Sequence, residues 1–170
     1  MVWEGMVTEA LAICHGIHER YGPAKHNPFN EVECGDHYAR AMASWGVYTA
    51  LAGYEYHGPK GHLGFAPRLT PENFRAAFTA AEGWGTFAQK RDGRMQRERI
   101  ELRWGRLSLK DHSFVVPQEF RPLKVSVTAA GKPIESNHKL KDGRVEITLS
   151  KRLTIYENQA LEVTIERQGR

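Results

Sequence analysis

The densest group of reactive side chains lies in the segment 30–40, which reads Asn-Glu-Val-Glu-Cys-Gly-Asp-His-Tyr-Ala-Arg. Three carboxylates, a thiol, an imidazole and a guanidinium stand close together there. The segment leads into a predicted helix, whose first N–H groups and dipole favour acids, so Asp36 is interpreted as its N-cap. Arg40 lies one turn inside that helix, where a buried charge needs a partner or a polar ligand. A pocket beside the start of this helix would provide the polar ligand that the Arg40 side chain needs.

Two other kinds of chemistry are conceivable for the same segment. Glu33 and His37 have the i, i+4 spacing of metal ligands, with Cys34 or Asp36 nearby, but the set matches no strong zinc signature. Cys34 with His37 resembles a nucleophile and its base, yet the local carboxylates would raise the pKa of the thiol instead of activating it. We therefore expect no metal and no cofactor, and a metal-dependent hydrolase built on Glu33, Cys34 and His37 stays an alternative.

Two more polar regions carry weaker signals. The sequence Gly-Pro-Lys-Gly at 58–61, flanked by His57 and His62, could hold a phosphate but is not a Walker motif. Arginines are frequent between residues 94 and 106, where they alternate with apolar residues, as expected for the solvated face of a strand. No nucleic-acid-binding motif accompanies them, so we expect no nucleic-acid partner.

Three helices are predicted before residue 90. Apolar residues at steps of three and four from Trp3 to Tyr21 predict the first, which ends at Gly22-Pro23. The second runs from about residue 36 to 51, and its many alanines indicate an inner helix surrounded by protein. Between 53 and 69, glycines and prolines predict a turn-rich connection. Thr70, Pro71 and the acid after them then have the order of a helix N-terminus, which predicts a short third helix up to Ala81.

Beyond Gly85 the apolar period changes from 3.6 to 2, which predicts strands. The tetrapeptides 130–133 and 141–144 have turn composition, so we expect an antiparallel arrangement of about five or six strands. The chain thus divides into a helical segment, 1–89, and an antiparallel β segment, 90–170.

Composition narrows the class of protein. The chain has 170 residues, of which 41% are hydrophobic and 26% charged, as in ordinary globular domains. Residues 1–89 hold six basic and nine acidic residues, against eighteen and eleven in 90–170, so the two segments differ in charge. No apolar run is long enough to span a membrane, and the first residues do not resemble an export signal. We expect a cytoplasmic protein, and two cysteines without a C-x-x-C motif fit a reducing compartment.

The two segments 27–42 and 53–65 together resemble glycoside hydrolase family 116, which includes the non-lysosomal glucosylceramidase, also called bile-acid β-glucosidase, and bacterial β-glucosidases. They read Asn-Pro-Phe-Asn-Glu-Val-Glu-Cys-Gly-Asp-His-Tyr-Ala-Arg-Ala-Met and Gly-Tyr-Glu-Tyr-His-Gly-Pro-Lys-Gly-His-Leu-Gly-Phe. The sequence Ala-Ala-Glu-Gly-Trp-Gly at 80–85 extends the similarity. The resemblance covers about residues 1–90 and is thin over the β segment.

The resemblance implies that residues 1–89 are the C-terminal part of an (α/α)6 catalytic domain, with closing helices of the toroid followed by the β segment. It also implies that Glu31 and Arg40 hold hydroxyls of the glucose in the −1 subsite. A carboxylate accepts hydrogen bonds from hydroxyls and a guanidinium donates them, so both residue types suit this role.

Family members are several times longer, and their catalytic nucleophile and acid/base lie upstream of these motifs. We therefore expect the C-terminal portion of a retaining β-glucosidase that carries substrate-binding residues but no catalytic residue. Its expected partners are a β-glucoside and the missing N-terminal part of the catalytic domain. Without that part, apolar faces of the first two helices would be exposed. A non-catalytic carbohydrate-binding or interaction module is the alternative from another class.

Overall fold

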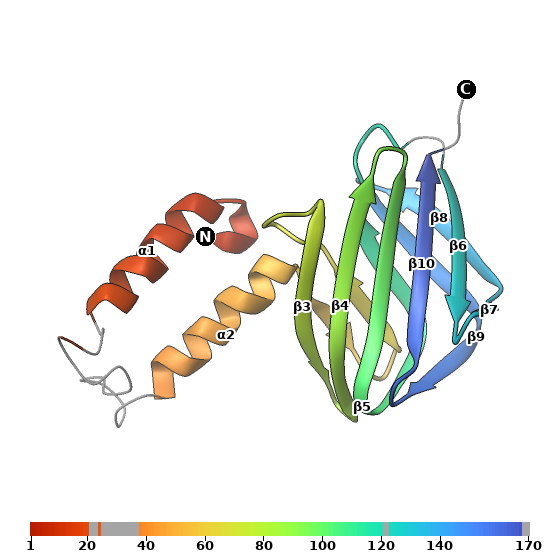
Figure 1. Cartoon of the computed structure of the whole chain (residues 1–170), viewed down its shortest axis with the longest axis horizontal. Coiled ribbons are helices and arrows are strands. Elements are labelled where there is room, and N and C mark those ends of the chain that lie inside the picture. Colours follow the sequence, from red (N-terminus) through yellow and green to blue (C-terminus); the bar gives the residue numbers. More distant parts are fainter. Residues whose placement is uncertain (21–23, 25–37, 121–122, 168–170) are drawn as a thin grey trace.

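The computed structural model describes residues 1–20, 24, 38–120 and 123–167, with side chains in the second helix described from residue 42 onward. The described part consists of helices at the N-terminal end and a two-layered β sandwich (Figure 1). The helices are η1 (Val2–Glu4), α1 (Val7–Arg20) and α2 (Tyr38–Ala52). Gly5, at φ 83°, separates η1 from α1, so the predicted first helix is interrupted near its start.

In the part of the chain that the structure describes, ten strands follow α2. They are β1 (Glu55–His57), β2 (His62–Phe65), β3 (Asn73–Ala80), β4 (Gly83–Asp92), β5 (Met95–Val115), β6 (Leu123–Ala129), β7 (Lys132–Pro133), β8 (Ser136–Lys141), β9 (Arg144–Tyr156) and β10 (Ala160–Arg167). The first sheet has the order β3-β4-β5-β10-β6-β7, and the second has the order β1-β2-β5-β9-β8. The long strand β5 belongs to both sheets. All pairs are antiparallel except β2 with β5.

The expected fold class is wrong. Among the described residues strands predominate, and only two α-helices are present, so closing helices of an (α/α)6 toroid are not seen. The predicted third helix is strand β3, in which Phe74, Ala76 and Phe78 turn inward while their neighbours turn outward. Thr70 has φ 46° and accepts a turn hydrogen bond from Asn73, so it does not begin a helix. Pairing of β3 with β4 therefore overrides the local helix-start signal.

The strand predictions beyond residue 90 are confirmed: six described strands, β5 to β10, begin there, within the expected number of about five or six. Four further described strands, β1 to β4, begin in the segment expected to be helical or turn-rich. The turn at 141–144 joins β8 to β9, and Asp142 and Gly143 both have positive φ, as a two-residue hairpin turn requires. The arginines of β5 turn outward as predicted: Arg99 pairs with Glu162 and lies near Glu101. The division of the chain at residue 89 stays a prediction.

The core lies between the two sheets. Inward-facing side chains of β4, β5 and β10 pack against those of β2, β5 and β9, and nearly all are fully buried. Phe87 from the first sheet stacks on Phe65 from the second, with ring centroids 3.8 Å apart. Such burial contributes about 25 cal/mol for each Å² of apolar surface removed from water, so the sandwich carries most of the folding free energy.

Three tyrosines from α2 and the residues after it lie along the outer edge of β3. The Tyr48 hydroxyl donates to the carbonyl of Ala77 and accepts from its N–H, at 3.1 and 2.6 Å. Tyr54 donates to the carbonyl of Thr79, and Tyr56 accepts from the N–H of Ala81. The three hydroxyls thus pair backbone groups that an edge strand would otherwise leave open, and they attach α2 to the sandwich.

Candidate functional site

The two residues predicted to bind glucose are not both placed by the structure. Glu31 lies outside the described residues, as do Glu33, Cys34, Asp36 and His37. Arg40 belongs to α2, two residues after its first residue Tyr38, and its side chain is not described. The assignment of both residues to a sugar site therefore stays a prediction from the sequence.

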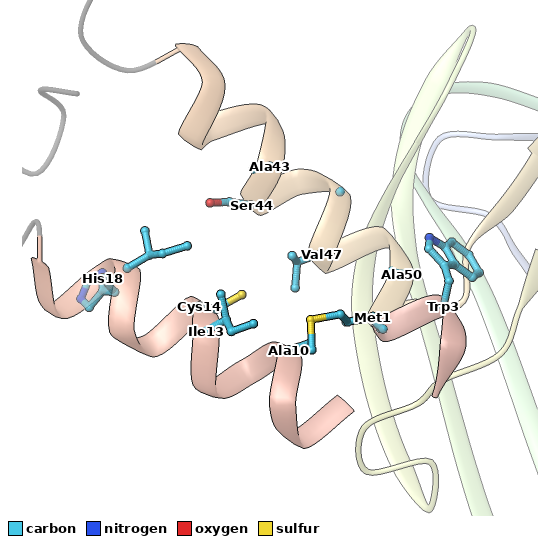
Figure 2. Close-up of a pocket in the computed structure, with 13 residues that line it drawn as sticks. Met1, Trp3, Ala10, Ile13, Cys14, His18, Ala43, Ser44, Val47 and Ala50 are labelled. Carbon is cyan, nitrogen blue, oxygen red and sulfur yellow. The ribbon is translucent and has the colours of Figure 1, made fainter. Parts of the chain in front are cut away.

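An apolar groove of about 720 Å³ lies between α1 and α2, with η1 at one end. Figure 2 shows Ile13 and Cys14 extending from α1 toward Val47 of α2, with Met1 nearby. Among the described residues of this region, only Val2, Ala10 and Ala50 are buried. Ile13 and Ile17 are 51% and 42% exposed, and the helix surface is therefore open along most of its length.

The open groove confirms the expectation of exposed apolar faces on the first two helices, but α2 is not the enclosed inner helix that its alanines indicated. Met42 and Trp45 are about half exposed, on the part of α2 nearest Arg40. The described helices include none that is both long and apolar enough to cross a membrane.

We expect the groove to cause self-association when the chain is purified alone. Replacing Ile17 by lysine should reduce the concentration-dependent increase in mass measured by size-exclusion light scattering, because it places a charge on the open apolar surface. Stability should change by no more than about 0.5 kcal/mol, as is usual at surface positions. Leu69, equally exposed at 42% but not lining the groove, provides the control Leu69→Lys. Equal effects of the two variants would contradict a role of the groove.

A polar pocket of about 470 Å³ lies on the second sheet. Neighbouring strands bring together Glu55 of β1, His62 of β2, Asp111 and Ser113 of β5, and Arg144 of β9. In the pairing of β2 with β5, His62 lies opposite Asp111 and Gly64 lies opposite Ser113. In the pairing of β1 with β2, Gly64 lies opposite Glu55. These positions alternate with the buried residues of the same strands, so they share the face opposite the core.

Hydrogen bonds form two groups in this pocket, and a longer ion-pair contact joins them into one network. His62 Nδ1 lies 2.5 Å from Asp111 Oδ1, and its Nε2 lies 3.6 Å from Glu55 Oε2. Arg144 donates to Glu55 Oε1 at 2.8 Å and to Ser113 Oγ at 2.9 Å. The guanidinium therefore crosses from β9 to β1, past Ser113 and Gly64. At the rim, Lys139 pairs with Glu146 at 2.8 Å, which raises the pKa of the lysine and lowers that of the glutamate.

Gly64 makes this bridge possible. A Cβ on Gly64 would lie 2.5 Å from Ser113 Oγ and 3.3 Å from both Glu55 Oε2 and His62 Nε2. A carboxylate oxygen, an imidazole nitrogen and a hydroxyl thus converge on the space that a side chain would fill. Beside them, His112 is fully buried, which lowers its pKa to about 4 and keeps it neutral.

The sequence analysis did not identify this pocket, because its members come from five strands in three separate stretches of the chain, 55–62, 111–113 and 139–148. Only His62 was noted, as part of a loop that could hold phosphate. The structure gives that loop a different role: Arg152 donates to the carbonyls of Pro59 and Lys60, and Gly61 closes the turn with its own N–H. The loop thus presents carbonyl oxygens to a cation, and no described contact there favours a phosphate. The alternation of polar and buried residues on β5 and β9 was the available signal for the pocket.

Comparison with known proteins establishes no family. No family model matches the sequence, and no curated protein matches it. A solved α-L-rhamnosidase from Dictyoglumus thermophilum is a distant structural neighbour. It shares 13% identity at a TM-score of 0.43, and the match covers 74% of this chain but only 13% of the rhamnosidase. The resemblance to glycoside hydrolase family 116 therefore rests on the motif residues alone.

Proposed function

We propose that this chain is the C-terminal portion of a retaining β-glucosidase or glucosylceramidase-like glycoside hydrolase, in which Glu31 and Arg40 bind the glucosyl unit of a β-glucoside. The observation that carries the proposal is the open groove beside α2, the helix that holds Arg40 near its start. A covering polypeptide would remove this apolar surface from water, and a glucose site at the start of α2 would then lie beside that polypeptide.

In this proposal the present chain binds the sugar, and the covering polypeptide carries the catalytic carboxyl groups. Retaining glycosidases need two carboxyl groups about 5–5.5 Å apart, a nucleophile and a general acid that later acts as base. The motif places neither in this chain, so the covering part of the catalytic domain supplies both. Glu31 accepts hydrogen bonds from sugar hydroxyls, and Arg40 donates to sugar oxygens through its rigid fork. Together they orient the sugar relative to the two catalytic carboxyls.

Activity assays with an aryl β-glucoside test this proposal. The polypeptide encoded directly upstream of this chain is expressed together with it, and the chain alone serves as the reference. We expect no cleavage by the chain alone and cleavage with retained anomeric configuration by the pair. Glu31→Gln or Arg40→Lys should lower kcat/KM about 10- to 100-fold, because a hydrogen bond to a charged group contributes about 1.5–3 kcal/mol. Glu9→Gln, at an exposed position of α1, is the control.

Three outcomes would overturn the proposal. The first is cleavage by the chain alone that Glu33→Gln or Asp36→Asn abolishes, because the catalytic residues would then be local. The second is an active pair in which the Glu31 and Arg40 variants behave like the unchanged chain. The third is an upstream sequence that encodes no hydrolase. Glucose binding by the lone chain that Glu31→Ala weakens, combined with this third result, would favour the carbohydrate-binding module.

A further inference from the structure

We propose that the polar pocket on the second sheet binds a small neutral polyol, a monosaccharide or a cyclitol, at a site separate from Glu31 and Arg40. Its lining comes entirely from strands and does not include any groove residue. At about 470 Å³, it falls within the range of about 300–1,000 Å³ that small-molecule sites occupy. The inference does not depend on the glycosidase proposal.

The charges of the pocket favour an uncharged ligand. Arg144 is paired with Glu55, and Lys139 with Glu146, while His62 is hydrogen-bonded to Asp111. Each charged group therefore already has a partner of opposite sign or a hydrogen-bonding neighbour. An anion or a cation would have to displace one of these partners and leave a half-buried charge uncompensated, which is costly. A neutral ligand binds without breaking any pair.

The hydrogen-bonding capacity of the pocket favours hydroxyl groups. The two carboxylates of Glu55 and Asp111 each have about four lone-pair positions, and only part of that capacity is used within the network. Arg144 has five N–H donors, and Ser113 keeps its own O–H while accepting from Arg144. Donors and acceptors thus alternate over adjacent strands. A hydroxyl group both donates and accepts, so a ring that carries several hydroxyls matches this alternation.

The missing side chain of Gly64 lets three polar side chains close over the backbone, because a Cβ there would lie only 2.5 Å from Ser113 Oγ. The row Glu55, Gly64, Ser113 and Glu146 crosses four strands, and only Gly64 lacks a side chain. Glu55 and Asp111 are about 40% exposed, while His62 and Arg144 are more covered, so the network opens to solvent on one side. A ligand hydroxyl on the solvent side of this cluster would meet Ser113 Oγ, Glu55 Oε2 and His62 Nε2 together.

Amide NMR titration of the full chain tests the proposal with defined probes. Glucose, methyl β-glucoside and myo-inositol represent neutral polyols, inorganic phosphate represents anions, and glycine betaine represents zwitterions. We expect saturable shifts of the Gly64 and Ser113 amides with at least one polyol and none with phosphate or betaine. Glu55→Gln should weaken binding about 10-fold or more, because it replaces a charged acceptor by an amide and removes the pairing of Arg144.

A matched variant on the other sheet controls for general effects of charge. Glu162 pairs with Arg99 and is similarly exposed, so Glu162→Gln should leave polyol binding unchanged. Gly64→Ala should abolish binding, because its Cβ would lie 2.5 Å from Ser113 Oγ and displace the polar cluster. If that variant does not fold, Ser113→Ala provides the same test by a smaller change.

The titration also separates a ligand site from a network that only holds β1 on the sheet. A structural network would give no polyol shifts, and that result overturns the proposal. Binding of phosphate, or equal binding by the Glu55 and Glu162 variants, would overturn it as well. Shifts confined to residues 27–42 would support the glucose site of the proposed function while contradicting this pocket. Arg40→Lys should leave the Gly64 and Ser113 shifts intact, so the two proposals fail independently.

Discussion

The stability of this protein should fall as pH rises from about 6.5 to 8, and the replacement Glu98→Gln should remove most of that fall. Burial raises the pKa of Glu98 to about 8, against the opposing effects of a hydrogen bond from Gln96 and the charge of Arg91. In the unfolded chain the carboxyl has its usual pKa near 4.5. Between these values Glu98 binds one proton more in the folded state than in the unfolded state, so its contribution to stability decreases with pH. Below about pH 6.5 the lowered pKa of His112 has the opposite effect, so the net fall lies between about 6.5 and 8.

The structure explains why Glu98 holds its proton. Gln96 donates to one carboxyl oxygen of Glu98 at 2.6 Å, while the other oxygen has no partner within the described structure. Gln89 stands directly opposite Glu98 in the pairing of β4 with β5, and its buried amide oxygen likewise lacks a partner. A protonated Glu98 carries the O–H donor that this acceptor needs. Arg91, which bonds Gln96 at 2.7 Å, compensates only part of the cost of ionisation.

Urea denaturation at several pH values measures the effect. A shift from 4.5 to about 8 corresponds to about 5 kcal/mol of folding free energy, present in full below pH 4.5 and lost as pH rises through 8. Glutamine reproduces the shape and the donor of the protonated acid, so Glu98→Gln should be more stable than the unchanged chain at pH 8–9. Glu162→Gln, at an exposed position, should keep the original slope. An unchanged slope in Glu98→Gln would show that Glu98 does not hold the proton.

Replacing Phe87 by alanine should cost about 3–5 kcal/mol, a large share of the about 5–15 kcal/mol typical of a whole domain. Phe87 is fully buried and stacks on Phe65, with a nearly parallel ring, across the space between the sheets. It also lies within 6.2 Å of the rings of Phe74 and Phe114. Alanine would leave a cavity in the middle of this aromatic cluster, which the surrounding strands cannot close without losing their pairing.

Urea denaturation at constant pH gives this loss as a shift of the midpoint with an unchanged slope. Phe74→Ala is the matched control, because Phe74 belongs to the same cluster but is only partly buried. It should cost less than half as much. A loss below about 1 kcal/mol for Phe87→Ala would show that the two sheets do not depend on this stack. The double variant with Phe65→Ala should cost less than the two single losses together, because the rings contact each other.

Local patterns predicted the elements whose partners are also local. The alternation along β9 and β10 and the turn at Asp142-Gly143 need only neighbouring residues to be recognised. The prediction of a helix in the segment 70–82 was wrong for the opposite reason. Thr70 and Pro71 imitate a helix start, whereas the alternation of Phe74, Ala76 and Phe78 becomes decisive only through pairing with β4.

The polar pocket could not be predicted in the same way. Glu55 and Arg144 are 89 residues apart, and they meet only because β2 pairs with β5 in parallel while β5 pairs with β9. No spacing in the sequence encodes that arrangement. The sugar site is the reverse case: Glu31 and Arg40 were found through a continuous motif, and the described structure adds only the helix that carries Arg40 and the groove beside it.

The row of Tyr48, Tyr54 and Tyr56 along β3 determines where this protein can be shortened. A β domain cut out after residue 56 would keep every strand from β2 onward but would leave the outer backbone groups of Ala77, Thr79 and Ala81 without their hydroxyl partners. Such a piece would have a free strand edge that can pair with other copies of itself, so we expect it to form ordered aggregates. The smallest soluble sandwich therefore begins before Tyr48, because α2 and its tyrosine cover the edge of β3 and prevent that strand from pairing with another copy.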